Sequence, residues 1–487
     1  SNVILHQFEG LHKLWDTPIL SVDIFSEGVD VPEINQVIML RPTQSPIVFI
    51  QQLGRGLRKA EDKEYVVILD FIGNYKNNFM IPIALSGDRS YNKDNVRKYV
   101  VSGNSLIPGA STIHFDEISK ERIFNAVDNL KSMKALIKES YTSLKNRLGR
   151  IPRLVDFYEN EEIDPMIIIR EYKTYYAMLK AMEKKQEIEE LSDSETLILE
   201  YLSKTILSGV RPQELELLKM LLEHNEVSIE EFQEDVSVEF GYLLDMNAIK
   251  NTIRILQGHF HINSAEHQKY AQIDILKVNE NKRIQRLNSF VSKLNESEFR
   301  KELNDIISFG LHRYKDKYNQ NKNQGVPFVL YEQYSRRDIC FLMNCEKDLS
   351  SVMYGMKRIE DDVFIFVTYH KKQTKDASKK YVDGKPDYDD RFESNQIFCW
   401  DTQLGKGINS SYSQSVITAS RKHLMVQKRD RQIKFYYLGQ FDILEVKPAK
   451  KLNQKGKEQD IAKFRVKMRN PVREDIWQYF LSNVDEE

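Results

Sequence analysis

The sequence of 487 residues has only three cysteines, Cys340, Cys345 and Cys399, and none of them is spaced as C-x-x-C. A disulfide framework or a zinc knuckle is therefore not indicated, and we expect no metal site. The three side chains are expected to be small buried hydrophobes in a reducing compartment. The sequence has no apolar run long enough to span a bilayer, and no signal peptide precedes the first predicted strand. We therefore expect a cytoplasmic protein with no membrane partner.

Two motifs of ATP hydrolysis are also absent. The chain has no G-x-x-x-x-G-K-[ST] phosphate loop and no D-E-x-[HD] box for a metal ion. Hydrolysis needs both a phosphate cradle and a carboxylate that holds magnesium. We therefore expect that this chain alone binds no cofactor and does not hydrolyse ATP.

The composition describes an ordinary soluble chain of about three domains, with 41% hydrophobic and 29% charged residues. The net charge is −1, but the charge is unevenly spread, because residues 421–473 carry 16 lysines and arginines against five acidic residues. Such a basic block on a β scaffold attracts phosphate backbones through counterion release. Two alternatives to nucleic-acid binding remain: the basic residues are spread over all faces of the domain, or they form a binding site for an acidic protein.

The stretch from Gln51 to Arg58, QQLGRGLR, lies between two apolar runs at residues 36–40 and 65–71. Arg55 and Arg58 fall on one face if the segment is helical. Their guanidinium groups suit the oxygens of a transferring phosphoryl group. Two arginines on a helix more often form a solvated face, so the pair alone is weak evidence.

The preceding segment strengthens the phosphoryl interpretation. A predicted strand at residues 18–22 is followed by Gly28-Val29-Asp30 and a second strand at 36–40. This order resembles motifs V and VI of superfamily 2 helicases, in the second RecA-like lobe. The resemblance implies that ATP is bound by Gly28, Asp30, Gln51 and Gly54, with Arg55 and Arg58 as catalytic arginine fingers. It also implies a longer parent protein that uses ATP and Mg²⁺, because the early strands of the lobe are not found.

We expect a multidomain chain with three parts. Residues 1–105 form the C-terminal part of an α/β RecA-like lobe with a connection, and residues 106–318 form an all-α coupling domain. A polar Asn/Gln-rich linker leads to residues 325–487, an α+β domain. Within the helical part, we expect a helix that opens at Ser119, and residues 148–165 could form either a spacer or a helix-turn-helix that touches DNA.

The C-terminal part changes from helical to β patterning. Ser335 is a predicted N-cap of a short helix. Strands are predicted at residues 326–331, 363–369, 397–400, 433–438 and 463–468. Short strands with Gly, Asn and Asp turns favour a small curved or barrel-like domain.

Aromatic and hydrogen-bonding residues interleave with these strands. A flipped base can stack between two aromatic rings, while an acid or amide between them forms hydrogen bonds with the edge of the base. Any single aromatic residue more commonly packs in the core. The C-terminal part resembles the C-terminal domain of the SauUSI-like family of modification-dependent (type IV) restriction enzymes. The resemblance rests on five short sequence motifs: YSRRDI, FVTYHK, YDDR, FCWDTQ and YLG. The residues that the resemblance implies for binding the modified base or DNA are Tyr334, Ser335, Arg336, Thr368, Tyr369, Lys371, Tyr388, Asp390, Trp400, Thr402 and Gln403.

The resemblance implies an SRA/PUA-like β-barrel that flips 5-methylcytosine or 5-hydroxymethylcytosine out of DNA. It also implies ATP-dependent restriction by a parent protein in which a nuclease and the first helicase lobe lie upstream. A helicase-linked, PUA-like module that binds DNA or RNA in repair or RNA handling is the alternative function.

Overall fold

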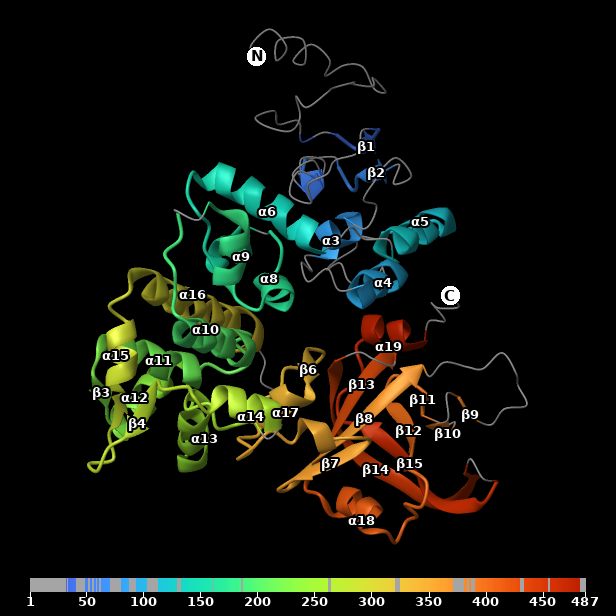
Figure 1. Cartoon of the computed structure of the whole chain (residues 1–487). Coiled ribbons are helices and arrows are strands. Elements are labelled where there is room, and N and C mark those ends of the chain that lie inside the picture. The colour runs from blue at the N-terminus through green and yellow to red at the C-terminus, as the bar shows by residue number, and fades with distance from the viewer. Residues whose placement is uncertain are drawn as a thin grey trace, which may run out of the picture. The chain divides into compact units, whose positions relative to one another are not determined.

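The computed structural model describes residues 32, 34–40, 49–50, 53–54, 57, 59–60, 63–70, 80–86, 93–102, 113–128, 133–160, 162–184, 187–261, 264–319, 325–370, 381–382, 385–386, 390–429, 433–453 and 456–481. The chain divides into two compact units, Ser1–Leu130 and Lys131–Glu487 (Figure 1).

The first unit contains a small α/β core. Strands β1 (Gln36–Met39) and β2 (Val67–Asp70) pair in parallel, which requires a crossover connection of the kind that α/β lobes use. Three helices follow, α3 (Met80–Ser86), α4 (Lys93–Ser102) and α5 (Glu117–Asp128). Both strands overlap the runs predicted from the sequence. The expected start of α5 at Ser119 is wrong, because the Asp116 side chain accepts a hydrogen bond from the Ser119 backbone and the helix begins earlier.

The second unit begins with a helical part. Its helices are α6 (Met133–Leu148), α7 (Leu154–Glu159), α8 (Pro165–Tyr172), α9 (Tyr175–Met182), α10 (Asp193–Thr205), α11 (Gln213–Glu223), α12 (Ile229–Phe240), α13 (Met246–Leu256), α14 (Ser264–Tyr270), α15 (Asn288–Lys293), α16 (Ser297–Arg313) and a π-helical turn, η4 (Tyr314–Tyr318). It also holds a three-stranded sheet that the all-α prediction missed, with β3 (Glu226–Val227), β4 (Leu276–Val278) and β5 (Ile284–Arg286) in the order β3-β5-β4.

Local sequence explains where these helices begin. The Asp164 side chain accepts a hydrogen bond of 2.9 Å from the Met166 backbone, and Pro165 occupies the first position of α8. In the segment 148–165, the Leu154 backbone at the start of α7 donates to both carboxylate oxygens of Asp305 in α16, at 3.0 Å each. The start of α7 is thus anchored to α16, and contact of the segment 148–165 with DNA stays a prediction.

Close approach of the backbone explains one glycine in α16. A Cβ at Gly310 would lie 2.6 Å from Cδ1 of Leu215 in α11, so α16 crosses α11 at a distance that a larger residue would prevent. The carbonyl oxygen of Gly310 would in turn lie 2.3 Å from a Cβ at Gly209, whose φ is +64°. Gly310 thus allows α11 to approach α16, and Gly209 allows the loop before α11 to do the same.

Residues 325–481 form what we call the C-terminal module. Its strands are β6 (Gln333–Ser335), β7 (Met356–Ile359), β8 (Asp362–His370), β9 (Tyr381–Val382), β10 (Lys385–Pro386), β11 (Arg391–Phe392), β12 (Ile397–Asp401), β13 (Arg421–Arg429), β14 (Lys434–Leu452) and β15 (Glu458–Met468). Its helices are α17 (Arg336–Leu342), η5 (Ser350–Val352), α18 (Ser411–Thr418) and α19 (Glu474–Leu481). The strand predicted at 326–331 is wrong, because this segment makes turns before β6.

Eight of these strands form one sheet, in the order β11-β12-β15-β14-β13-β8-β7, with β6 also paired to β14. The long strand β14 joins its two halves: its first part pairs with β13, and its part from Phe441 onward pairs with β15. Irregular steps at Leu424/Met425 and Ile443/Glu445 accompany this change of partner. Among the described strands the path from β11 to β7 is open, so the predicted barrel is not confirmed.

One face of this sheet packs on a core that α18 and α19 complete. Val363, Ile365 and Val367 alternate along β8 toward this core, together with Trp400 and Phe464 from the other half of the sheet. The intervening residues of β8 point to the opposite face. That opposite face carries the candidate site.

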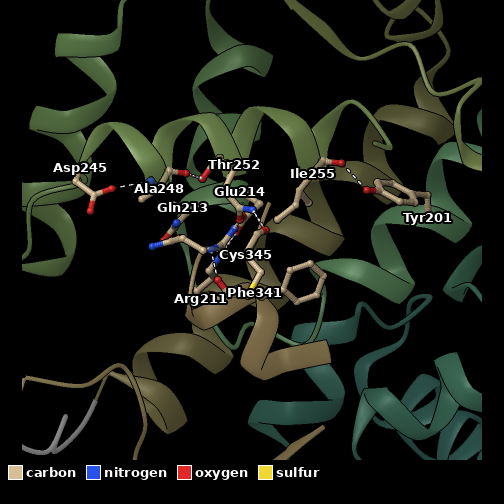
Figure 2. A network of polar contacts seen from close by, with 12 residues as sticks. Tyr201, Arg211, Gln213, Glu214, Asp245, Ala248, Thr252, Ile255, Phe341 and Cys345 are labelled. Carbon is tan, nitrogen blue, oxygen red and sulfur yellow. Dashed lines mark hydrogen bonds and ion pairs between the residues drawn. The ribbon is translucent and has the colours of Figure 1, made fainter. Parts of the chain in front are cut away.

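A buried polar joint connects the C-terminal module with the helical part (Figure 2). Arg211, just before α11, forms an ion pair with Glu214 and donates hydrogen bonds to the carbonyl oxygen of Phe341 and, at 2.6 Å, to Asn251 Oδ1 in α13. The Asn251 amide then donates to the carbonyl oxygen of Cys345. One guanidinium thus ties two helices of the helical part to the end of α17.

A second set of contacts lies beside this joint. Arg337 of α17 pairs with Glu266 of α14 at 3.1 Å and with Asp348 at 2.8 Å. The rings of Phe260 and Phe341 stack with their centroids 4.6 Å apart. These contacts show why residues 131–487 behave as one compact unit although the sequence has a polar stretch between its parts.

The described helices include none that is both long and apolar enough for a membrane span. Within the same described residues, no three His, Cys, Asp or Glu side chains gather in a way that could hold a metal ion. Cys340 and Cys345 are buried, as predicted, and Cys399 is partly exposed.

Candidate nucleic-acid interface

A group of six residues gathers on the sheet face opposite the core. Phe366 and Thr368 of β8 lie opposite Met425 and Gln427 of β13, and the Gln427 amide donates a hydrogen bond of 2.8 Å to Thr368 Oγ1. Phe435 of β14 packs edge-on against Phe366, with ring centroids 5.2 Å apart. We call the group the Arg336 cluster; its members are Arg336, Tyr354, Phe366, Thr368, Gln427 and Phe435.

Arg336 lies among three aromatic rings. Its guanidinium carbon is 4.9 Å from the ring centre of Phe435, 5.0 Å from that of Tyr354 and 5.5 Å from that of Phe366. Ser335 fixes its position, because this residue pairs with Lys434 of β14 and accepts a hydrogen bond from the Asp338 backbone at the start of α17. Burial lowers the pKa of Arg336, and the neighbouring Tyr354 opposes this shift.

The turn at Tyr354 and Gly355 connects the Arg336 cluster with a second group of residues. Its members are Trp400, Thr402, Gln403 and Tyr412. The Tyr354 side chain is 63% exposed, and its carbonyl oxygen accepts a long hydrogen bond of 3.4 Å from the Gln403 amide. Gly355 has a φ of +71°, and a Cβ there would lie 2.6 Å from Gln403 Nε2 and 2.9 Å from the Tyr412 hydroxyl. The missing side chain therefore lets Gln403 and Tyr412 approach this turn.

Trp400 packs against Tyr412 of this second group from the core side. Its ring stacks on Tyr412 with centroids 6.3 Å apart and an interplanar angle of 26°, and Phe464 lies 5.2 Å away. Trp400 is only 4% exposed. In the structure it therefore contributes to the surface through Tyr412, and direct contact of Trp400 with a base stays a prediction.

Thr402 orders the loop that carries Gln403. Its hydroxyl donates a hydrogen bond of 2.7 Å to the Lys406 carbonyl oxygen and accepts one of 2.8 Å from the Ala462 backbone. The Thr402 side chain is fully buried, so its observed role is to hold the loop against β15. Asp390 accepts a hydrogen bond of 3.1 Å from the Asp401 backbone, on the same side of the module.

The structure brings together only some of the residues implied by the family resemblance. Arg336 and Gln403 both contact Tyr354, and Thr368 bonds Gln427 on the same sheet face. Tyr334 is buried, where its hydroxyl accepts a hydrogen bond of 2.9 Å from the Val329 backbone. Tyr369 points to the core face and packs against Phe392 and Phe480. Gly54 is helical, and the other predicted positions lie outside the described residues: Gly28, Asp30, Gln51, Arg55, Arg58, Lys371 and Tyr388.

Sequence reasoning missed Tyr354, Phe366, Gln427 and Phe435. The alternation along β8 contained a signal for Phe366, since it shares a face with Thr368. No sequence signal distinguishes Tyr354, because its importance comes from neighbours supplied by α17 and by the loop after β12.

Part of the predicted basic surplus is neutralised locally. Lys451 of β14 pairs with the buried carboxylate of Asp401 at 2.8 Å, and Arg465 of β15 pairs with Glu393 at the same distance. These pairs reduce the positive field along the β14–β15 ribbon. Arg336, which lies outside this basic block, has no carboxylate partner among the described residues.

Comparison with known proteins addresses the first unit. Residues 2–60 match the family model "Helicase conserved C-terminal domain". This confirms the helicase lobe predicted from motifs V and VI. In the second unit, residues 137–318 match "Domain of unknown function (DUF8090)", and residues 328–480 match "Domain of unknown function (DUF3427)".

Two curated relatives are helicases by name. "Putative ATP-dependent helicase IRC3" of Saccharomyces cerevisiae is 39% identical over 72 residues, which are 15% of this chain and 10% of that protein. "Putative ATP-dependent RNA helicase MJ1505" of Methanocaldococcus jannaschii is 40% identical over 50 residues, which are 10% of this chain and 6% of that protein. The chain thus spans a tenth or less of the length of these relatives.

Two solved structures show low similarity to this chain. Arabidopsis thaliana SUVH6 in complex with SAM has a TM-score of 0.21 and 10% identity, and the match covers 36% of this chain and 33% of that one. The sulfur-binding and SRA domains of ScoMcrA, complexed with phosphorothioated DNA, have a TM-score of 0.20 and 10% identity, over 57% of this chain and 91% of that one. TM-scores near 0.2 do not establish a common fold, so the SRA-like fold stays a prediction.

Proposed function

We propose that this chain is the DNA-recognition part, and part of the motor, of an ATP-dependent, modification-dependent restriction enzyme. The C-terminal module binds DNA that contains 5-methylcytosine or 5-hydroxymethylcytosine and flips the modified base out of the duplex. One observation carries the proposal: a chain with a helicase C-terminal domain also holds a β module on which Arg336, Tyr354 and Gln403 converge at one turn.

The chemistry of this surface suits nucleic acid. An exposed ring offers a face on which a base can stack, an amide offers hydrogen bonds to a base edge, and a guanidinium attracts phosphate. A C5 methyl group adds only apolar area, so a pocket that fits it gains about 1–3 kcal/mol over unmodified cytosine. Further discrimination comes from the free energy needed to flip the base.

The motor role completes the proposal. In the parent protein, Arg55 and Arg58 stabilise the charge that develops on the γ-phosphate of ATP, with Mg²⁺ held by the first lobe. Gly28, Asp30, Gln51 and Gly54 contact the nucleotide. The upstream nuclease then cuts DNA that the motor translocates, while this chain alone has no turnover.

The experiment that tests this function compares nucleic acids by fluorescence anisotropy at fixed salt. Labelled duplexes of one sequence would be DNA with 5-methylcytosine, DNA with 5-hydroxymethylcytosine, unmodified DNA and RNA. We expect the modified DNA duplexes to bind most tightly and RNA most weakly. Preference for RNA, with equal affinity for modified and unmodified DNA, would instead support a helicase-linked RNA-binding module.

A further inference from the structure

We infer that Arg336 and Tyr354 together bind one nucleotide unit of the DNA strand. Arg336 contacts a backbone phosphate and Tyr354 stacks on the adjacent base. The inference rests on the proposed function and deepens it, because it separates the residue that provides affinity for any DNA from residues that distinguish the modification.

The first argument is the missing counter-ion of Arg336. Among the residues that the structure describes, this guanidinium has no ion pair, and its buried Nε has no hydrogen-bond partner. Other arginines of the C-terminal module differ: Arg337 pairs with Asp348 at 2.8 Å, Arg421 with Asp362 at 2.6 Å and Arg473 with Asp475 at 2.5 Å. A half-buried charge without a partner is costly, and an external anion would compensate it.

The second argument is the rigidity of the Arg336 side chain. Rings on three sides restrict its rotamers, so binding an anion requires little further ordering. A planar guanidinium with several donors matches the oxygens of a phosphodiester. Such contacts position a duplex and carry little sequence information.

The third argument identifies the anion as a nucleic-acid phosphate. Tyr354, which lies over the same guanidinium, is the exposed ring of the cluster, at 63%. In nucleic acid a base follows each phosphate, and an exposed ring beside a cation suits that repeat. The Gln403 amide holds the Tyr354 carbonyl oxygen, which fixes the turn that presents the ring.

The test measures DNA affinity of the whole chain as a function of salt, for methylated and unmodified duplexes. The variants are Arg336→Gln, Arg336→Lys, Tyr354→Ala and Tyr354→Phe. The control is Arg170→Gln, which removes an exposed arginine of α8 whose ion pair in the described part of the chain is with its neighbour Glu171. Thermal unfolding of each variant verifies that it is folded.

For Arg336→Gln we expect the slope of log affinity against log salt to become shallower by about 1, with equal loss on both duplexes. Arg336→Lys should retain most of the slope, because it keeps the charge. Tyr354→Ala should lose about 5- to 150-fold in affinity, whereas Tyr354→Phe keeps its ring and stays near wild type. Arg170→Gln should change neither quantity.

An unchanged salt slope in folded Arg336→Gln, with a wild-type chain that binds DNA, would overturn this inference and leave the proposed function standing. Equal losses for Tyr354→Ala and Tyr354→Phe would also overturn it, because the hydroxyl and not the ring would then be the contact. A wild-type chain that binds no DNA at all would instead refute the proposed function.

Discussion

Arg211 Nη2 donates a hydrogen bond of 2.6 Å to Asn251 Oδ1, and both residues are buried between the helical part and the C-terminal module. The same guanidinium reaches the carbonyl oxygen of Phe341, near the end of α17, while Arg336 begins that helix in the candidate site. A single short helix therefore links the proposed DNA contact to the helical part. This arrangement suits a coupling role for residues 106–318.

Loss of Arg211 should destabilise the second unit strongly. Arg211→Ala leaves Glu214 buried without its partner, for which we expect a loss of about 3–5 kcal/mol in the free energy of unfolding. Urea denaturation measures the change. Arg254→Ala is the matched control, because Arg254 spans the same two parts through an exposed pair with Glu346 and should cost at most about 1 kcal/mol. Similar losses in the free energy of unfolding for both variants would show that the buried joint stabilises the protein no more than the exposed ion pair does.

Asp305 should make the stability of the helical part depend on pH. Burial raises the pKa of this carboxyl from 3.8 to about 7 in the folded protein. Since the folded state holds the proton more tightly, this contribution to stability is full below pH 4 and is lost as the pH rises through about 7. Asp305→Asn keeps an oxygen for the Leu154 backbone and should flatten the decline between about pH 4 and 7, measured by thermal unfolding as a function of pH.

The control for Asp305 is Asp193→Asn, which changes an exposed aspartate of α10. This control separates the loss of a buried carboxyl group from the loss of one negative charge at the surface. Glu302, also in α16, acts in the same direction, because burial raises its pKa well above the usual range. A slope that is equally steep in wild type and in Asp305→Asn would contradict the assignment to Asp305.

Trp400 connects the core with the proposed base site. Trp400→Ala should lower the free energy of unfolding by about 3–5 kcal/mol. Within the folded population, we expect a larger loss of affinity for methylated than for unmodified DNA, because Tyr412 loses the ring on which it stacks. Phe464→Leu is the control, since it disturbs the same core without touching Tyr412. If both variants weaken both duplexes equally, Trp400 is a core residue only.

Arg58 should be essential for ATP turnover in a polypeptide that contains both helicase lobes. Arg58→Ala removes the proposed arginine finger, and we expect turnover to fall by about 10³-fold or more. Binding of methylated DNA should persist, because the C-terminal module is intact. Lys59→Ala, at the neighbouring exposed position, should retain turnover. Retained turnover in Arg58→Ala would remove the finger role.

Local patterns predicted several elements of the C-terminal module. The strands β8 and β12 follow apolar β-rich runs, and the Ser335 side chain caps α17 as expected. These features depend on neighbouring residues, so they can be inferred from sequence. The strand predicted at residues 326–331 is wrong because apolar residues here pack in the core without forming a strand. Phe328, for example, packs against Tyr334 and Tyr437.

The arrangement of the site could not be inferred in the same way. The partner change of β14 depends on strands far apart in the chain, and it decides which residues share the face of Arg336. Tyr354 becomes notable only because residues 336 and 403 approach it from different elements. Tertiary contacts of this kind leave no periodic signal in the sequence.

The most direct test of the central claim uses two DNA duplexes that differ only in the C5 methyl group of one cytosine. Equilibrium titration of the chain with each duplex, at the same salt concentration, gives the ratio of the two dissociation constants. Recognition of the methylated base predicts tighter binding of the methylated duplex by about 5- to 150-fold. A ratio of one would contradict recognition of methylcytosine by this chain.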